Sequence, residues 1–286
     1  MTDVDVVVVG SLNLDLVVRS QRIPGAGETI SGSEYAEYAG GKGLNQAVAA
    51  ARSGASVAFV GNVGDDEAGE RLRSIVRAEG IDDARLHTID GMATGRALIT
   101  VDDHGENSIV IVPGANGAPL HGDLPRGRVF LAQLETTVAG VRRAFEHARS
   151  IGATTVLNPA PAVDLPGELL GLCDVVVPNE HEVDLLGGRT ALSGRVEHVV
   201  VTLGSAGADH VNDTRTAHIE AFPVTPVDTT GAGDAFCGAL AGRIAAGDEM
   251  DAALRFAAAA GALATTQPGA VPSQPRLAEV QRLLSA

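Results

Sequence analysis

The chain has 286 residues, and its formal net charge of −15 argues against a surface that binds DNA, RNA or anionic lipid, because clustered Lys and Arg hold those partners. Aromatic residues make up only 3%, so the core of one large domain with a small appendage must consist mainly of Val, Leu, Ile and Ala. Cys173 and Cys237 lie far apart and outside any CxxC or Cys/His cluster, which predicts a reducing, cytoplasmic setting without disulfide or zinc.

The first expected element is a buried strand, "VVVVG" at 6–10. Its apolar stretch is too short to span a membrane and lacks the basic start of a secretion signal. Five similar runs alternate with helical segments, which predicts a mainly parallel α/β sheet covered on both faces. They are 57–61, 129–133, 154–159, 174–179 and 198–204. Asn158, Asn179 and Gly204 then fall at strand ends, where such sheets bind ligands.

Two segments, 11–39 and 94–113, alternate polar and apolar residues and carry turn residues. We expect them to form a small antiparallel sheet, which would serve as a lid over the site or as an edge for dimerisation. The clearest helical patterns are at 43–53, 67–79, 138–150, 234–246, 251–266 and 275–285.

Two glycine-rich stretches fail the familiar phosphate-binding patterns. "GGKG" at 40–43 lacks the spacing and the Ser or Thr of a Walker A loop, and "GAGDAF" at 231–236 has Phe236 in place of the third dinucleotide-binding glycine. Small residues that open a helix still direct N–H groups at an anion. Asp234 is then either an ordinary helix cap or a base beside an anion hole, as transfer of a phosphoryl group to an alcohol requires.

These stretches belong to a longer set of motifs, and the chain resembles the PfkB-type (ribokinase) family of sugar kinases, most closely its ribokinases. The resemblance covers nearly the whole length. It rests on "GSLNLD", "GGKGLNQAVAAARSGASVAFVGNVGDDEAG" at 40–69, "GENSIVIVPGAN", "QLET", "NPAPA", "PNEHE", "TLGSAG", "DTTGAGD" and "GAVPS" in matching order and spacing.

The resemblance implies a Rossmann-like, three-layer α/β/α kinase domain over 1–286 with the small sheet as a lid. It implies ATP-dependent phosphorylation of a sugar's primary hydroxyl, D-ribose O5 in the first instance. Asp234 would be the base, and the N–H groups of Gly231, Ala232 and Gly233 the anion hole. The implied sugar contacts are Asn13, Asp15, Gly41, Lys42, Asn45, Glu135 and Asp234, and the implied nucleotide contacts are Asn179, Glu182, Thr202, Gly204 and Gly207.

Several of these residues also have ordinary interpretations. Asn13 and Asp15 could face solvent from a strand, and Lys42 could be an exposed loop lysine. Glu182 could be a first-turn helix carboxylate, favoured there by the helix dipole. Gly204 and Gly207 could form only a turn.

The resemblance also implies Mg²⁺, held by Glu182 through water, and a K⁺ activator. The K⁺ ligands would be Asp228, Thr230, Ala264, Gln267, Gly269 and Ser273. It further implies a cytoplasmic homodimer formed through the lid, with ATP and a small sugar as its ligands and no nucleic acid or membrane partner.

Two departures from the family pattern stand out. Ala257 replaces a polar residue expected beside the nucleotide base, and the segment 189–195 is short enough to loosen packing or expose a strand. The alternatives are another sugar kinase acting on deoxyribose, a ketohexose or a nucleoside, or a non-catalytic sensor. Low aromatic content argues against a nucleoside, although Tyr35, Tyr38 or Phe236 would offer a stacking surface, and a sensor has no need of Asp234.

Overall fold

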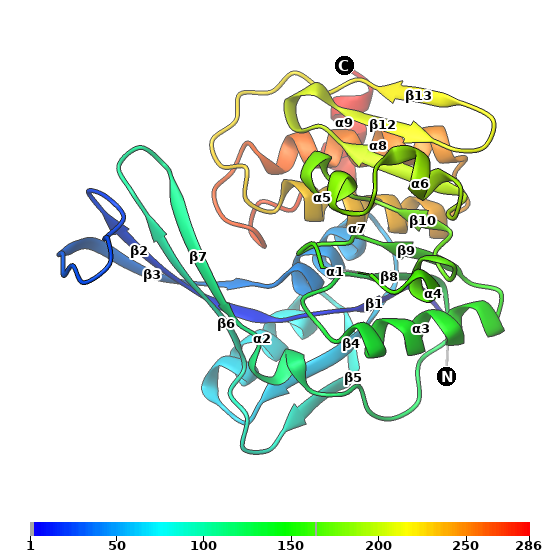
Figure 1. Ribbon diagram of the computed structural model, residues 1–286. Coiled ribbons are helices and arrows are strands. Elements are labelled where there is room, and N and C mark those ends of the chain that lie inside the picture. Colours follow the sequence, from blue (N-terminus) through cyan, green and yellow to red (C-terminus); the bar gives the residue numbers. More distant parts are fainter. Residues whose placement is uncertain (1–2, 164) are drawn as a thin grey trace.

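The computed structural model describes residues 3–163 and 165–286, and a nine-stranded sheet forms its centre (Figure 1). The strand order is β13-β12-β11-β10-β9-β8-β1-β4-β5, with only β12 and β13 antiparallel to their neighbours. The strands are β1 (Val4–Val9), β4 (Val57–Gly64), β5 (Asp82–Ile89), β8 (Gly127–Ala132), β9 (Thr154–Leu157), β10 (Val175–Val176), β11 (His198–Thr202), β12 (Ala208–Val211) and β13 (Thr216–Ile219).

The Val-rich strands lie in the middle because each of their two faces packs on helices. In β1, Val6 and Val8 pack toward one layer while Val7 and Val9 pack toward the other, and all four are fully buried. One layer contains α1 (Lys42–Arg52), α2 (Glu67–Ala78), α7 (Ala232–Ala245), α8 (Met250–Ala264) and α9 (Leu277–Leu284), and the other α3 (Val138–Ser150), α4 (Gly167–Leu170), α5 (Glu180–Leu185) and α6 (Arg189–Ser193). The predicted three-layer fold is confirmed.

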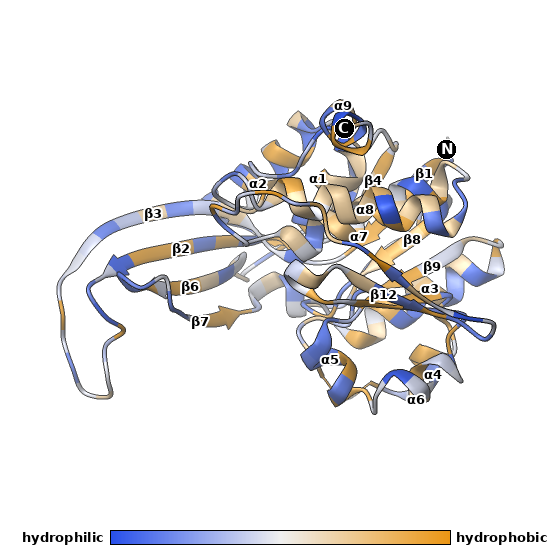
Figure 2. Ribbon diagram, turned by 90° about the horizontal axis from the view of Figure 1, so that it is seen from above, coloured by the Kyte–Doolittle hydropathy of each residue, from blue (hydrophilic) through white to orange (hydrophobic). Residues whose placement is uncertain are grey.

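The second sheet has four strands in the order β3-β2-β6-β7 and extends away from the main body (Figures 1 and 2). It consists of β2 (Asn13–Ser20), β3 (Gly32–Gly40), β6 (Gly95–Val101) and β7 (Asn107–Val112). The separate small sheet predicted from residue alternation is therefore present. Its two outer pairings are antiparallel, whereas β2 and β6 pair in parallel across its middle.

Several elements lie outside the predicted pattern. The edge strand β5 and the β12–β13 hairpin are only partly buried, so their sequences lack the uniform apolar run that marks the central strands. The predicted loosening at 189–195 is wrong: this segment forms α6, Leu192 is buried, and Arg189 forms an ion pair with Asp209 on β12. Strand β11 behind it keeps Val199, Val200 and Val201 fully buried.

Candidate functional site

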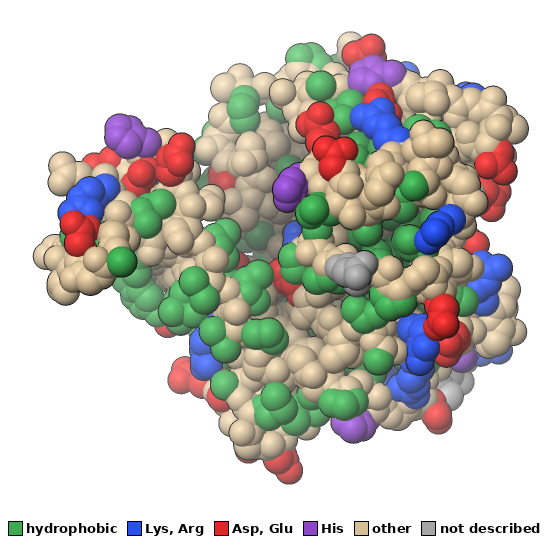
Figure 3. Space-filling model, in the orientation of Figure 1, with side chains coloured by type: hydrophobic (Ala, Val, Ile, Leu, Met, Phe, Trp, Pro, Cys, Tyr) green, Lys and Arg blue, Asp and Glu red, His purple; other side chains and the backbone are tan. Residues whose placement is uncertain are grey.

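A cleft of about 490 Å³ opens at the carboxyl ends of the central strands, beside the small sheet (Figure 3). Its walls come from five regions that are far apart in the sequence. They are Lys42 at the start of α1, Asn158 and Ala160 after β9, Val177 to Glu182 around α5, Thr202 and Gly204 after β11, and Gly231 to Cys237 at the start of α7. The structure thus brings eight of the predicted residues to this cleft: Lys42, Asn179, Glu182, Thr202, Gly204, Gly231, Gly233 and Asp234.

Asp234 is buried at the floor of the cleft and accepts two side-chain hydrogen bonds. Asn45 Nδ2 donates to its Oδ2 at 2.9 Å, and Gln46 Nε2 donates to its Oδ1 at 2.8 Å. The interpretation of Asp234 as a helix cap is wrong, because α7 begins at Ala232 and its N-cap is Gly231. The carboxylate therefore owes its orientation to α1 and not to its own helix.

Gln46 belongs to a fully buried amide chain that sequence reasoning missed. Its Nε2 also donates to Asn158 Oδ1 at 3.0 Å, and its Oε1 accepts from Gln133 Nε2 at 2.6 Å. Gln46 and Gln133 have no exposed surface. Buried polar groups are costly unless they are paired, so this chain fixes the amide that holds Asp234. A glutamine in an alanine-rich helix, right after Asn45, was the available signal.

Glu135, just beyond β8, receives three donors on one oxygen. Ser11 Oγ, the Lys42 N–H and Asn13 Nδ2 donate to Oε2 at 2.6, 3.0 and 3.4 Å. Among the described residues Oε1 has no donor, which leaves it for a ligand. Glu135 thus links the end of β8 to the start of β2 and the start of α1.

Asn13 and Asp15 do not face solvent from their strand, so that interpretation is wrong. Asn13 is 2% exposed, and its Oδ1 accepts from Asn116 Nδ2 at 2.8 Å. Asp15 has no hydrogen-bond donor among the described residues. Burial, followed by the charges of Glu135 and Asp234, raises its pKa to about 7.

Lys42 is the only lysine in the sequence, which contains 20 arginines. It opens α1 and is half-buried, so the exposed-loop interpretation is wrong. The negative charge of Asp234, then those of Glu135 and Glu182, raises the pKa of its ammonium against the opposing effect of burial. Gly41, its N-cap, has φ 91°, and a Cβ there would lie 2.8 Å from the backbone N of Asn13.

The start of α7 presents unpaired backbone donors to the cleft. The first intrahelical acceptor is Gly231 O, which takes Ala235 N–H, and among the described residues the N–H groups of Gly233 and Asp234 have no acceptor. The Ala232 N–H makes a long contact of 3.3 Å to Thr229 O. A Cβ on Gly233 would meet nothing within 4 Å, so the approach to these donors is open.

The wall opposite α7 carries the "NEHE" motif. Asn179 caps α5 and accepts from Glu182 N–H at 2.8 Å, while Glu182 Oε2 accepts from Asn179 N–H at 2.9 Å. Glu182 is thus a first-turn helix carboxylate, as in its ordinary interpretation. It also lines the cleft, and burial raises the pKa of its carboxyl group.

Gly204 lines the cleft, but Gly207 does not. Gly207 has φ 92°, and a Cβ there would lie 2.1 Å from Ile219 O, so its lack of a side chain serves the packing of β13. Two more residues lie away from the cleft. Ala257 is fully buried in the core, and Phe236, 5% exposed in the same core, offers no stacking surface.

Two loops meet behind the start of α7. Asp228 Oδ1 accepts from Thr230 N–H at 2.9 Å, and its Oδ2 accepts from Gly269 N–H at 2.8 Å. These bonds bring the 228–230 loop against the segment after α8. The six residues suggested for a monovalent cation are divided between these two loops: Asp228 and Thr230, then Ala264, Gln267, Gly269 and Ser273.

Within residues 3–163 and 165–286, no group of three or more His, Cys, Asp or Glu side chains is placed to hold a metal ion. In the same part of the chain, no helix is both long and apolar enough to cross a bilayer.

Comparison with known proteins agrees with this geometry. Residues 3–277 match the pfkB family of carbohydrate kinases. The ribokinase of Haemophilus influenzae is 37% identical over 297 residues, covering 97% of each chain. The deoxyribokinase of Salmonella typhi is 32% identical over 302 residues, covering 98% of this chain and 99% of its own.

A solved structure shares the whole fold. It is the ribokinase of Arabidopsis thaliana complexed with ribose and ATP, which is 30% identical and superimposes with a TM-score of 0.90. The match covers 100% of both chains. The two proteins therefore share their fold over the whole length of both chains.

Proposed function

This chain belongs to the pfkB family of carbohydrate kinases, and from that premise we propose that it phosphorylates D-ribose at O5 with ATP, giving ribose 5-phosphate and ADP. The observation that carries the proposal is a buried carboxylate, Asp234, beside the unpaired N–H groups of Gly233 and of Asp234 itself. A base next to an anion cradle is what transfer to a hydroxyl needs.

In the reaction, O5 of the sugar gives its proton to Asp234 and attacks the γ-phosphorus. The bond from that phosphorus to the bridging oxygen of ATP breaks, and ADP leaves in line. Asn45 and Gln46 hold the carboxylate in place throughout. The backbone at Gly231, Ala232 and Gly233 stabilises the charge on the transferring group.

The sugar would lie between the small sheet and α1. Asp15 and the free Oε1 of Glu135 accept its hydroxyl hydrogens, and Asn13 and Gly41 shape the wall beside them. Asn45 would contact both the sugar and the catalytic base Asp234. Its Oδ1 is buried without a donor among the described residues. Lys42 neutralises part of this acidic group.

The nucleotide would lie along Asn179, Glu182, Thr202 and Gly204, with Gly207 shaping the loop from behind. When bound, Mg²⁺ neutralises charge on the phosphates. Glu182 is the residue we assign to hold it, through water, because its Oε2 is already committed to Asn179 N–H.

The loops around Asp228 fit a large monovalent cation. The Asp228 carboxylate keeps lone pairs beyond its two N–H bonds, and the segment from Ala264 to Ser273 supplies further oxygens. We therefore propose K⁺ at Asp228, Thr230, Ala264, Gln267, Gly269 and Ser273. Bound there, the ion contributes positive charge behind the anion hole.

The small sheet, with the segments 11–39 and 94–113, would act as a lid on one kinase domain. It would also form a homodimer interface, because β7 exposes apolar side chains: Ile109 51%, Val110 60%, Ile111 41% and Val112 48%. Figure 3 shows hydrophobic side chains gathered on this projecting part. Use of ATP suggests the cytoplasm as the place of action.

A sugar panel tests the proposal. The purified protein is assayed with ATP, Mg²⁺ and K⁺ against ribose, 2-deoxyribose, fructose and adenosine, by ADP release and by NMR of the phosphorylated position. We expect the highest kcat/KM for ribose, with phosphate on O5. The likeness to a deoxyribokinase makes 2-deoxyribose the second candidate. A preference for 2-deoxyribose would change the proposed substrate but not the proposed mechanism. No ADP release with any sugar would contradict kinase activity.

A further inference from the structure

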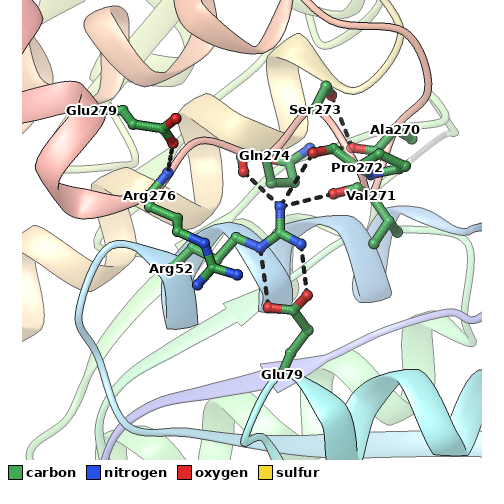
Figure 4. Close-up of polar contacts among 9 residues, drawn as sticks. All are labelled: Arg52, Glu79, Ala270, Val271, Pro272, Ser273, Gln274, Arg276 and Glu279. Atoms are coloured by element: carbon green, nitrogen blue, oxygen red, sulfur yellow. Dashed lines mark hydrogen bonds and ion pairs between the residues drawn. The ribbon is translucent and has the colours of Figure 1, made fainter.

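Arg52, the last residue of α1, binds a loop that comes from the far end of the chain (Figure 4). Its Nη1 donates to the backbone oxygens of Val271, Pro272 and Gln274 at 3.2, 3.3 and 2.7 Å. A guanidinium that holds three carbonyls of one loop determines the path of that loop, because a charged donor forms strong hydrogen bonds.

Glu79, just after α2, completes the arrangement. Its carboxylate accepts from Arg52 Nε at 3.0 Å and from Nη2 at 2.6 Å, and the two side chains are only 12% and 16% exposed. The hydrogen bond from Arg52 lowers the pKa of Glu79. The pair therefore stays ionised and adds no net charge near the loop.

The loop held by Arg52 supports the start of α7. Gln274 Nε2 donates to Ala270 O at 2.8 Å and to Gly231 O at 3.3 Å. Gly231 has φ 78°, and a Cβ there would lie 3.1 Å from the Cα of Ala270. A shift of the 270–274 backbone would therefore displace the turn that presents the Gly233 N–H.

The carbonyls that Arg52 holds differ from the positions assigned to the cation. Arg52 binds at 271, 272 and 274, whereas the proposed cation residues of this segment are Ala264, Gln267, Gly269 and Ser273. The two sets occupy one loop without competing. The guanidinium of Arg52 would thus hold the loop backbone in place, and the proposed cation would bind other residues of the same loop.

We propose that Arg52 is a positioning residue, which with Glu79 holds the 271–274 loop so that the cation site and the anion hole at α7 keep their shape. The role in turnover rests on the proposed kinase function. The role in loop order does not, and it can be measured without any substrate.

Hydrogen exchange of the free protein tests loop order. In Arg52→Met, peptides covering 267–275 and 227–234 should exchange about tenfold faster or more, because charged hydrogen bonds are lost. Added K⁺ should slow this exchange less than in the parent protein. Arg73→Met is the matched control, since Arg73 and Asp83 form an ion pair of similar burial, 12% and 20% exposed, away from both loops.

Two further variants separate charge from geometry. Glu79→Gln keeps an acceptor for Arg52 and should leave exchange near the parent value. Arg52→Lys retains the charge but not the fork of donors, and it should give an intermediate rate; it also serves if Arg52→Met does not fold. Unchanged exchange at 227–234 in both Arg52 variants, or the same change in Arg73→Met, would overturn the proposal.

Activity then completes the test. With ribose and ATP, kcat of Arg52→Met should fall about tenfold, the K⁺ concentration for half-maximal rate should rise, and KM for ribose should stay constant. If the parent protein does not phosphorylate ribose, the proposed function fails while the exchange result still decides the role of Arg52. Altered exchange with an unaltered K⁺ requirement would contradict the link to the cation.

Discussion

The two sheets supply the site in different ways. The main sheet is complete within one chain, with its central strands buried on both faces, and the carboxylates in the body around it, Glu135 after β8 and Asp234 in α7, each have donors in place. The small sheet exposes every residue of β7, and its carboxylate, Asp15, has no donor among the described residues. One half of the proposed site therefore has its hydrogen-bond donors in place, whereas the other has a carboxylate that we propose receives its donors from the sugar.

The largest effect on KM for ribose should come from the half without a partner. In Asp15→Asn, KM for ribose should rise roughly 10- to 100-fold, because a hydrogen bond to a charged group is lost, while kcat changes little. Initial-rate kinetics over a wide ribose range measure it. An unchanged KM would remove Asp15 from sugar binding.

The same variant should be more stable than the parent protein at alkaline pH. The Asp15 pKa is about 7 in the folded protein against an ordinary value of 3.8, so the folded state binds more protons between those limits. Stability therefore falls as pH rises through that window, and Asp15→Asn should gain in melting temperature at pH 8 but little near pH 4. An equal gain at both pH values would contradict this account.

In the half with its donors in place, Gln46→Met should lower kcat roughly tenfold and leave KM for ribose unchanged, because Asp234 loses one of its two donors. Gln133→Met is the comparison variant: Gln133 is equally buried but acts on Asp234 only through Gln46, so its loss should lower kcat less. Kinetics of both variants at saturating ATP provide the measurement. Equal losses in the two would point to damaged packing and not to the orientation of Asp234.

Glycine substitutions test how tightly the half with its donors in place is packed. A Cβ on Gly43 would lie 2.4 Å from the backbone N of Ser11, so Gly43→Ala should cost about 1–3 kcal/mol of folding free energy. Gly233→Ala has open space and should leave the melting temperature near the parent value. Equal melting temperatures for the two variants would show that the α1–β1 junction relaxes freely.

The smallest effect on folding should come from the outer strand of the small sheet. Val110→Lys on β7 should shift the protein toward monomer in sedimentation, with unfolding free energy changed by no more than about 0.5 kcal/mol. Leu185→Lys on α5, where Leu185 is 62% exposed, is the matched control and should leave the association state alone. A protein that is monomeric before substitution would contradict the dimer.

Much of this fold was predictable from the sequence, because its central strands are uniform runs of Val and its helices repeat apolar residues at helical spacing. The β12–β13 hairpin and α4 were missed, since they are short and only partly apolar, and α5 was considered only as an ordinary interpretation of Glu182. The site residues were predicted through motifs whose spacing mattered more than any single residue. Gln46 was missed because its role depends on Gln133 and Asn158, which the chain brings close only on folding.

The central claim is that Asp234 removes the proton from O5 as the phosphoryl group is transferred. Asp234→Asn retains the shape of the side chain but not its basicity. We predict that calorimetry will give ribose and ATP affinities near those of the parent protein, while kcat falls by about 10²- to 10⁴-fold. Near-normal turnover in Asp234→Asn, with binding intact, would contradict the account.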